Sequence, residues 1–314
     1  MRALFAKQPG GPLAIREVAK PVPQSNDVVV RMEAAGINPS DINNVVDGRF
    51  PETTFPCIPG RDFAGVVVEG PPSWKGQPVL GSVSSLGFTR PGTHAEYISV
   101  PTDALVRRPE SLPVSQAAAL GVPFTTAWMA LLVRAGLQPG ETALVTGGRG
   151  AVATAALQIG RWAGAKMIGV SHGPPEAADG VTWVKLQPGW ADEVLDVTEG
   201  RGVDLVFDMV GGEGFRECQE ALGYRGRMVV IASPSHPIVS LPVVDFYHQE
   251  QTLMGVDSLK FTIAEIRRLL ERVVSGIISG HLSGLSVSPA PLTNAVDVYM
   301  NLKHGTHGKW VLLN

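Results

Sequence analysis

Three small residues at fixed spacing follow a short apolar run in the middle of the sequence. Gly148, Gly150 and Ala153 form the pattern G-x-G-x-x-A, and an alanine-rich segment follows them. In this pattern the first glycine permits a tight turn, the second lets a phosphate approach the backbone, and the small third residue lets a helix pack on a strand. The N–H groups of Ala151 and Val152, at the expected helix start, favour an anion. The pattern predicts a dinucleotide-binding loop, and a bare turn is the alternative.

The next apolar run ends in residues that bear on the choice of dinucleotide. An NAD site of this kind usually has an acidic residue about 20 residues after the glycine motif, where it accepts a hydrogen bond from the ribose 2′-hydroxyl. Here Ser171 and His172 stand at that place. No carboxylate repels a 2′-phosphate there, and the Ser171 hydroxyl can donate to it. NADPH is therefore predicted in preference to NADH.

Two regions of different pattern are expected to position these residues. Residues 1–120 are rich in Pro and Gly and hold short β-branched runs, which indicates a mostly β region. Over 121–259 short apolar runs alternate with helical patterns, which indicates six parallel strands in a doubly wound α/β sheet. Residues 262–278 are amphipathic at helical spacing, and the last apolar run, 308–313, is expected to return to the first region. The helix after the glycines is expected to bury a face that holds Val152, Ala156, Ile159 and Ala163.

Composition excludes several classes of partner. The chain has 314 residues, 44% of them hydrophobic, and a formal net charge of -3, so it offers no broad electrostatic attraction to nucleic acid. No apolar stretch reaches the ~18 residues of a membrane span, and no secretory pattern opens the chain. Cys57 and Cys218 are too few for a disulfide framework, so reduced thiols and a cytoplasmic location are expected.

Motifs along nearly the whole chain resemble one enzyme superfamily. They are GINPSDI (36–42), PCIPGRDFAGVVVEG (56–70), GTHAEYISVP (92–101), AAALGVPFTTAW (117–128), the glycine loop, GRGVDLVFDMVGG (200–212) and GKWVLL (308–313). In order and spacing they resemble the medium-chain dehydrogenase/reductase superfamily, and within it the zinc-independent quinone oxidoreductases and enoyl reductases.

The resemblance implies an architecture and a cofactor. It implies a GroES-like catalytic domain over 1–120, a Rossmann domain over 121–259, and a segment, 260–314, that completes the first domain. It further implies NAD(P)H bound in the cleft between the domains and, commonly, a homodimer.

The zinc ligands of related alcohol dehydrogenases are not evident in this chain. Those enzymes hold a Cys in the segment around Asn38 and a His-Glu pair at the place of Gly60–Asp62. Arg61 stands there instead, and a guanidinium has no free lone pair for a metal. His304 and His307 are expected to lie in a solvated connection. No catalytic metal is predicted.

The absence of zinc would restrict the chemistry. A simple ketone becomes an alkoxide after hydride transfer and needs a Lewis acid or a strong proton donor. A quinone or an α,β-unsaturated carbonyl spreads the charge to a distant oxygen, so a hydrogen-bond donor and solvent suffice. A reductase of quinones or enones is predicted; a zinc-dependent alcohol dehydrogenase and a non-catalytic NADPH-binding sensor are the alternatives.

Few residues are candidates for orienting the reacting groups. Asn38 is expected either to donate its amide N–H toward the substrate or ribose, or to form the turn before a proline. Asp41 is a candidate of the same loop, although holding the loop together is its simpler role. The resemblance assigns Thr126 a hydrogen bond on the nicotinamide side. Phe50 lies near the position where enoyl reductases have a proton-donating tyrosine, so the proton donor is not predicted.

The resemblance also indicates further cofactor contacts. Counting back from the motif at 200–212 places Lys185 where NADPH-preferring relatives have a tyrosine at the end of the third strand. Its ammonium can reach a 2′-phosphate, although a solvated surface lysine is the alternative. Val210, Ala232 and Ser233, at the ends of the later strands, are also candidates for contacts with the cofactor. Trp183, in an apolar run, is expected in the core.

Overall fold

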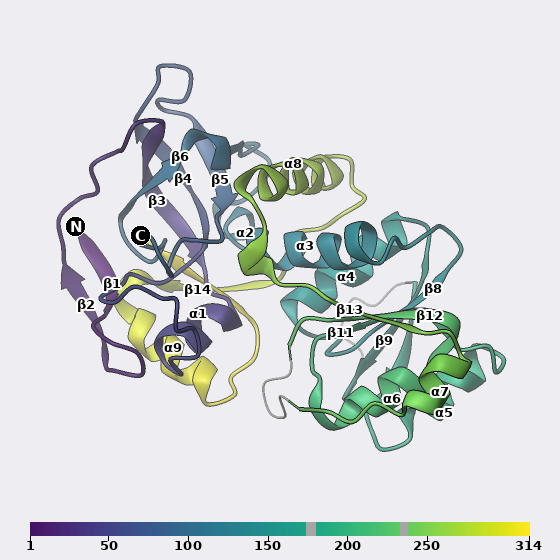
Figure 1. Cartoon of the computed structure of the whole chain (residues 1–314). Helices are drawn as coiled ribbons and strands as arrows, with labels where there is room; N and C mark the ends of the chain where they lie inside the picture. Colours follow the sequence, from purple (N-terminus) through teal and green to yellow (C-terminus); the bar gives the residue numbers. More distant parts are fainter. Residues whose placement is uncertain (174–179, 233–237) are drawn as a thin grey trace. The chain divides into compact units, whose positions relative to one another are not determined.

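The structure is a computed structural model that describes residues 1–173, 180–232 and 238–314 (Figure 1). It divides into two compact units. The first is Met1–Thr125 together with Ser258–Asn314, and the second is Thr126–Asp257. Helix α3 (Gly121–Trp128) carries the chain from the first unit into the second.

The first unit is built on a seven-stranded sheet. Its strands follow the order β14-β15-β3-β4-β5-β7, with β6 paired to β3, and β1 and β2 form a separate hairpin. The bounds are β1 (Arg2–Ala6), β2 (Leu13–Glu17), β3 (Asp27–Gly36), β4 (Asp62–Glu69), β5 (Pro78–Ser82), β6 (Tyr97–Pro101), β7 (Val106–Arg107), β14 (Val287–Pro291) and β15 (Lys309–Leu313). Because β15 pairs antiparallel with β3, the last apolar run does return to the first unit, as predicted.

The first unit also contains helical segments of different lengths. They are α1 (Pro39–Val45), η1 (Thr102–Ala104), α2 (Val114–Ala117), η4 (Ser258–Lys260), α8 (Ile263–Ile278), η5 (Leu292–Asn294) and α9 (Ala295–Lys303). The predicted amphipathic helix is α8, which begins with a capping box between Thr262 and Glu265. Its buried face holds Ile266, Leu270 and Val273, at the spacing of one helical stripe.

The second unit is the doubly wound sheet that the alternating pattern predicted. Its six strands are parallel and follow the order β10-β9-β8-β11-β12-β13. The bounds are β8 (Thr142–Val145), β9 (Lys166–Ser171), β10 (Val181–Lys185), β11 (Val203–Asp208), β12 (Leu222–Val230) and β13 (Thr252–Gly255). Because the order reverses at β8, the carboxyl ends of β8 and β11 flank a topological switch point, where ligands of such sheets bind.

Helices cover both faces of this sheet, with α4 on one face and α5, α6 and α7 on the other (Figure 1). The helical segments are η2 (Met129–Arg134), α4 (Ala151–Trp162), α5 (Trp190–Val197), η3 (Gly212–Gly214), α6 (Phe215–Glu220) and α7 (Val243–His248). None of the described helices combines the length and the apolar composition that a membrane span requires.

The buried face of α4 is the predicted one only in part. Ala156 and Ile159 are buried as predicted, whereas Val152 and Ala163 are only half-buried. A Cβ at Gly160 would lie 2.3 Å from the Met167 sulfur, so this glycine leaves room for the methionine side chain where α4 packs on β9. The hydrophobic pattern therefore located the middle of the buried face and not its two ends.

Candidate active site

The glycine loop joins β8 to α4, and a different structural requirement explains the glycine at each of its positions. The positive φ of the turn, 62°, belongs to Gly147, which the predicted motif does not include. A Cβ at Gly148 would lie 2.6 Å from the indole of Trp183, so its glycine makes room for that ring. Gly150 is the N-cap of α4, and its extended backbone leaves the first N–H groups of the helix open to an anion.

Trp183 lies on the sheet beside the loop. It is half-buried, against the prediction of a core position, and a Cβ at Gly169 would lie 2.4 Å from its ring. Its Nε1 is buried without a hydrogen-bond partner in the described part of the chain. One glycine of the loop and one glycine of β9 thus accommodate the same indole, which the sequence spacing did not reveal.

The ends of β9 and β10 bring the predicted ribose contacts together. Ser171 and Lys185 are register partners on these neighbouring parallel strands. Lys185 and His172 are exposed, whereas Ser171 is buried and donates its hydroxyl to the carbonyl of Gly173. Ser171 and Lys185, which belong to different strands, therefore meet at the carboxyl ends of β9 and β10. The Lys185 ammonium gives this edge of the sheet a positive charge.

The remaining predicted cofactor contacts lie at the ends of β11 and β12. Val210 is 46% exposed just beyond β11, and Ala232 is exposed beyond β12. Ser233 lies outside the described residues. Val210 and Ala232 are therefore both open to solvent.

Asp208 holds the end of β11 to the end of β8. Its Oδ1 accepts hydrogen bonds from the Thr146 hydroxyl at 2.8 Å and from the N–H of Val210 at 3.0 Å, and Gly211 N–H donates to both oxygens at 3.1 Å. The Thr146 hydroxyl in turn accepts from the N–H of Met209. Sequence analysis missed this residue, although an acid that ends an apolar strand is its signal. The contacts fix the two strand ends at the switch point.

In the first unit, Asn38 and Asp41 begin helix α1. Both are nearly fully buried, and the Asp41 Oδ2 accepts the backbone N–H of Asn38 at 2.8 Å. The other oxygen, Oδ1, has no hydrogen-bond partner among the described residues. Burial raises the pKa of Asp41 to about 7. Asp41 thus secures the helix start, and its carboxyl titrates near neutrality.

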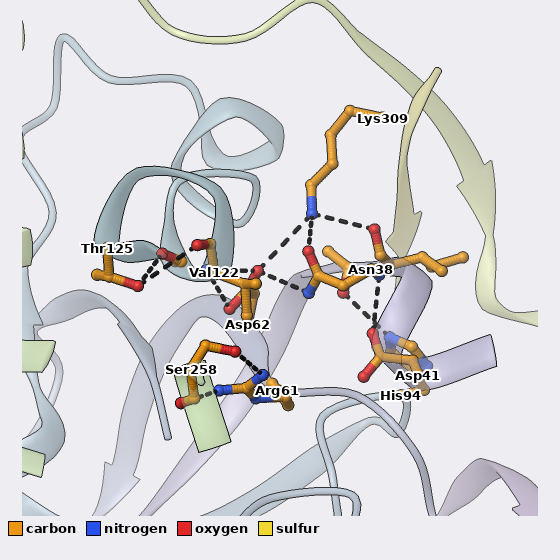
Figure 2. Close-up of polar contacts among 12 residues, drawn as sticks. Asn38, Asp41, Arg61, Asp62, His94, Val122, Thr125, Ser258 and Lys309 are labelled. Carbon is orange, nitrogen blue, oxygen red and sulfur yellow. Dashed lines mark hydrogen bonds and ion pairs between the residues drawn. The ribbon is translucent and has the colours of Figure 1, made fainter. Parts of the chain in front are cut away.

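Asp62, at the start of β4, lies at the centre of a buried polar cluster (Figure 2). Its Oδ2 accepts from the side-chain amide of Asn38 at 2.9 Å, and its Oδ1 accepts from the N–H of Val122 at 2.9 Å. Lys309 Nζ lies 3.7 Å from Oδ2 and donates to Asn38 Oδ1 at 2.7 Å and to the Ile37 carbonyl at 3.0 Å. Burial lowers the pKa of Lys309, and the nearby Asp62 opposes that shift.

Arg61 is buried next to Asp62 and extends in another direction (Figure 2). Its guanidinium donates to the Ser258 hydroxyl at 3.0 Å and to the Ser258 carbonyl at 2.9 Å. Its Cζ lies 6.0 Å from the ring centre of Phe88, which Phe50 meets edge-to-face. Phe50 therefore belongs to an aromatic contact and carries no hydroxyl to donate a proton.

His94 and Tyr299 form a buried pair that sequence analysis did not single out. The Tyr299 hydroxyl lies 2.8 Å from His94 Nδ1, and His94 Nε2 lies 3.3 Å from the carbonyl oxygen of Gly36. Because a carbonyl can only accept, Nε2 carries the proton and Nδ1 accepts from the tyrosine. Burial lowers the pKa of His94 to about 4, so the ring is neutral.

Thr126 is buried in α3, and its hydroxyl has no hydrogen-bond partner among the described residues. The neighbouring Thr125 hydroxyl, in contrast, donates to the carbonyl of Gly121 at 2.7 Å. An unpartnered buried hydroxyl is costly unless a ligand or water satisfies it. Thr126 and the open N-terminus of α4 therefore fit a nicotinamide dinucleotide.

The metal ligands of the superfamily have no counterpart among the described residues. No three His, Cys, Asp or Glu side chains gather there in an arrangement that suits a metal ion. At the positions of the zinc ligands, Asn38 and Arg61 are engaged with Asp62, Lys309 and Ser258.

Comparisons with known proteins agree with this fold and site. Residues 24–110 match the alcohol dehydrogenase GroES-like domain family, and residues 151–275 match the zinc-binding dehydrogenase family. The chain belongs to the medium-chain dehydrogenase/reductase superfamily, in its quinone oxidoreductase-like branch. It is an NAD(P)H-dependent oxidoreductase.

Individual relatives align over nearly the full chain. A zinc-type alcohol dehydrogenase-like protein of Schizosaccharomyces pombe, C337.11, is 34% identical over 99% of this chain and 96% of its own length. The human quinone oxidoreductase is 28% identical over 100% of this chain and 98% of its own. The crystal structure of an alcohol dehydrogenase superfamily protein from Novosphingobium aromaticivorans superposes with a TM-score of 0.89 at 25% identity, covering 100% and 99% of the two chains.

Proposed function

We propose that this oxidoreductase is a zinc-independent, NADPH-dependent reductase of quinones or α,β-unsaturated carbonyls. The observation that carries the proposal is Arg61, a buried guanidinium at the position of a zinc ligand, which donates to Ser258. A guanidinium cannot bind zinc, and its positive charge repels a cation at the same place.

The preference for NADPH is supported by the ends of β9 and β10. No carboxylate stands at the end of β9, and the exposed Lys185 is the register partner of Ser171. A lysine ammonium attracts the charged 2′-phosphate of NADPH more strongly than the neutral ribose hydroxyl of NADH. Lys185 and the exposed His172, which follows Ser171, are therefore assigned to the phosphate.

The bound cofactor would supply a hydride, and the chain's residues would bind and orient. The N–H groups at the start of α4 would hold the pyrophosphate, and the Thr126 hydroxyl would bond the nicotinamide side. The Asn38 amide would orient the acceptor or the ribose. The acceptor's negative charge develops on an oxygen remote from the attacked carbon, and protonation from solvent completes the reduction.

Steady-state kinetics with a panel of quinones and enones, each with NADPH and NADH, test the proposal. We expect turnover with a kcat/KM that favours NADPH. A preference for NADH would contradict the cofactor assignment, and tight cofactor binding without turnover on any acceptor would favour a sensor. Elemental analysis that finds about one zinc per chain, with activity lost to a chelator, would establish the zinc-dependent alternative.

Substitution of Asn38 tests the orienting role. Asn38→Ala is expected to reduce kcat/KM by about ten-fold, the effect of losing one oriented hydrogen bond of ~1.5 kcal/mol. Circular dichroism and the melting temperature control for the fold. Unchanged kinetics on an accepted substrate would leave Asn38 as a turn residue.

A further inference from the structure

We propose that Asp62 is a positioning residue of the reductase: its carboxylate orients the Asn38 amide and fixes the helix that carries Thr126. This inference rests on the proposed function. It assigns to Asp62 no contact with substrate or cofactor. Its two oxygens instead reach two elements that the proposed reaction uses, α1 with Asn38 at its start and α3 with Thr126.

The first link runs from Asp62 to the start of α3. The N–H of Val122 donates to Oδ1 at 2.9 Å and to Oδ2 at 3.1 Å, and Thr126 follows one helical turn later in the same helix. A carboxylate at a helix N-terminus satisfies an open N–H and is favoured by the helix dipole. A Cβ at Gly121 would lie 2.1 Å from Asp62 Oδ1, so the glycine permits this close approach.

The second link fixes which way the Asn38 amide faces. Its NH2 group donates to Asp62 Oδ2, and its oxygen accepts from the ammonium of Lys309. An inverted amide would place oxygen against carboxylate and NH2 against ammonium, and both contacts would be repulsive. Opposite charges on its two sides therefore select one orientation of Asn38.

Lys309 also offsets the free-energy cost of burying the Asp62 carboxylate. It is buried and lies 3.7 Å from Asp62 Oδ2, so the carboxylate has a counter-ion. A single substitution of either partner leaves an unpaired buried charge, and such a variant can lose activity simply because it unfolds. Positioning and stability must be separated by paired substitutions.

Two double variants make that separation. In Asp62→Asn with Lys309→Met, both charges are gone, and the asparagine oxygen still accepts from Val122, but its NH2 faces Asn38 and requires the inverted amide. In Asp62→Ala with Lys309→Met, the acceptor for Val122 is lost as well. Asp27→Asn is the matched control, because it breaks a half-buried ion pair with Arg90 in the same unit.

Three quantities are measured: melting temperature, the NADPH Kd from nicotinamide fluorescence, and kcat/KM for an accepted quinone or enone. We expect the Asn double variant to keep the melting temperature and Kd near wild type while kcat/KM falls about ten-fold or more. The Ala double variant is expected also to raise the Kd several-fold. Asp27→Asn is expected to lower only the melting temperature.

Different results would contradict the role of Asp62 and the proposed reductase function. A wild-type kcat/KM in the Asn double variant would overturn the orienting role, and a wild-type Kd in the Ala double variant would overturn the role at α3. If wild-type protein reduces no acceptor, the proposed function fails, while the Kd of the Ala variant still decides whether Asp62 fixes α3.

Discussion

Two polar regions of this protein differ in the exposure of their charged side chains to solvent. The cluster around Asp62 is closed: its members are buried, come from separate segments of the first unit and bond one another. The edge formed by the ends of β9 and β10 is open, and Lys185 and His172 are exposed there. A buried charge requires fixed partners, whereas an exposed charge is tolerated alone and is available to a ligand. The closed cluster thus sets geometry, and the open edge is suited to binding.

A lysine-to-methionine substitution in each region is expected to give the largest difference in the free energy of unfolding. Lys309→Met removes the counter-ion of Asp62 and is expected to lower the free energy of unfolding by about 3 kcal/mol. Lys185→Met, at the open edge, is expected to change it by less than about 0.5 kcal/mol. Denaturant titrations measure both. Equal losses would show that the two lysines do not differ in the way their burial indicates.

The pH dependence of stability separates two members of the first unit that act in opposite directions. The folded pKa of His94, about 4, lies below its unfolded value, so its contribution is present above about pH 6.5 and is lost as pH falls toward 4. The folded pKa of Asp41, about 7, is raised, so its contribution is present below about pH 4 and is lost as pH rises through 7.

Substituting either Asp41 or His94 should leave the pH dependence of stability that the other residue causes. Relative to wild type, Asp41→Asn is expected to gain stability by about 1 kcal/mol per unit as pH rises from 4 to 6.5. His94→Gln is expected to lose stability over the same range, by a similar slope. Denaturant midpoints at several pH values measure the differences, and parallel curves for all three proteins would contradict the burial of these groups.

The glycine loop can be tested for a structural requirement apart from phosphate binding. Gly148→Ala is expected to destabilise the protein by about 1–3 kcal/mol, because its Cβ would overlap the Trp183 ring. Trp183→Phe removes the overlapping ring atoms, so a double-mutant cycle should show a favourable coupling of about 1 kcal/mol. If Gly148→Ala weakens NADPH binding without a stability loss, the glycine serves only the ligand.

The smallest expected effect concerns the open edge itself. Lys185→Ala is expected to raise KM for NADPH several-fold, about 1 kcal/mol, and to leave KM for NADH nearly unchanged, with the difference shrinking at high salt. Lys166→Ala, at the other end of β9, is a matched control that removes an exposed lysine from the same sheet. Equal losses with both cofactors would remove Lys185 from the phosphate site.

Local patterns predicted most of the fold. Six short apolar runs became the six parallel strands, and the amphipathic run at 262–278 became α8. These succeed because strand and helix periodicity depend on neighbours a few residues apart. The buried face of α4 was predicted only in part, and the packing of Trp183 against Gly148 was not predicted, since both depend on side chains that other strands supply.

The candidate site shows the same division. The sequence by itself determined the glycine loop, the lack of an acid at the end of β9 and the arginine between Gly60 and Asp62, because each is a property of residue type at one position. Only the tertiary structure decided that Asp62 meets Asn38, Val122 and Lys309, and that His94 meets Tyr299. Those contacts join residues that lie far apart in the sequence, as Asp62 and Lys309 do, and the fold alone brings them together.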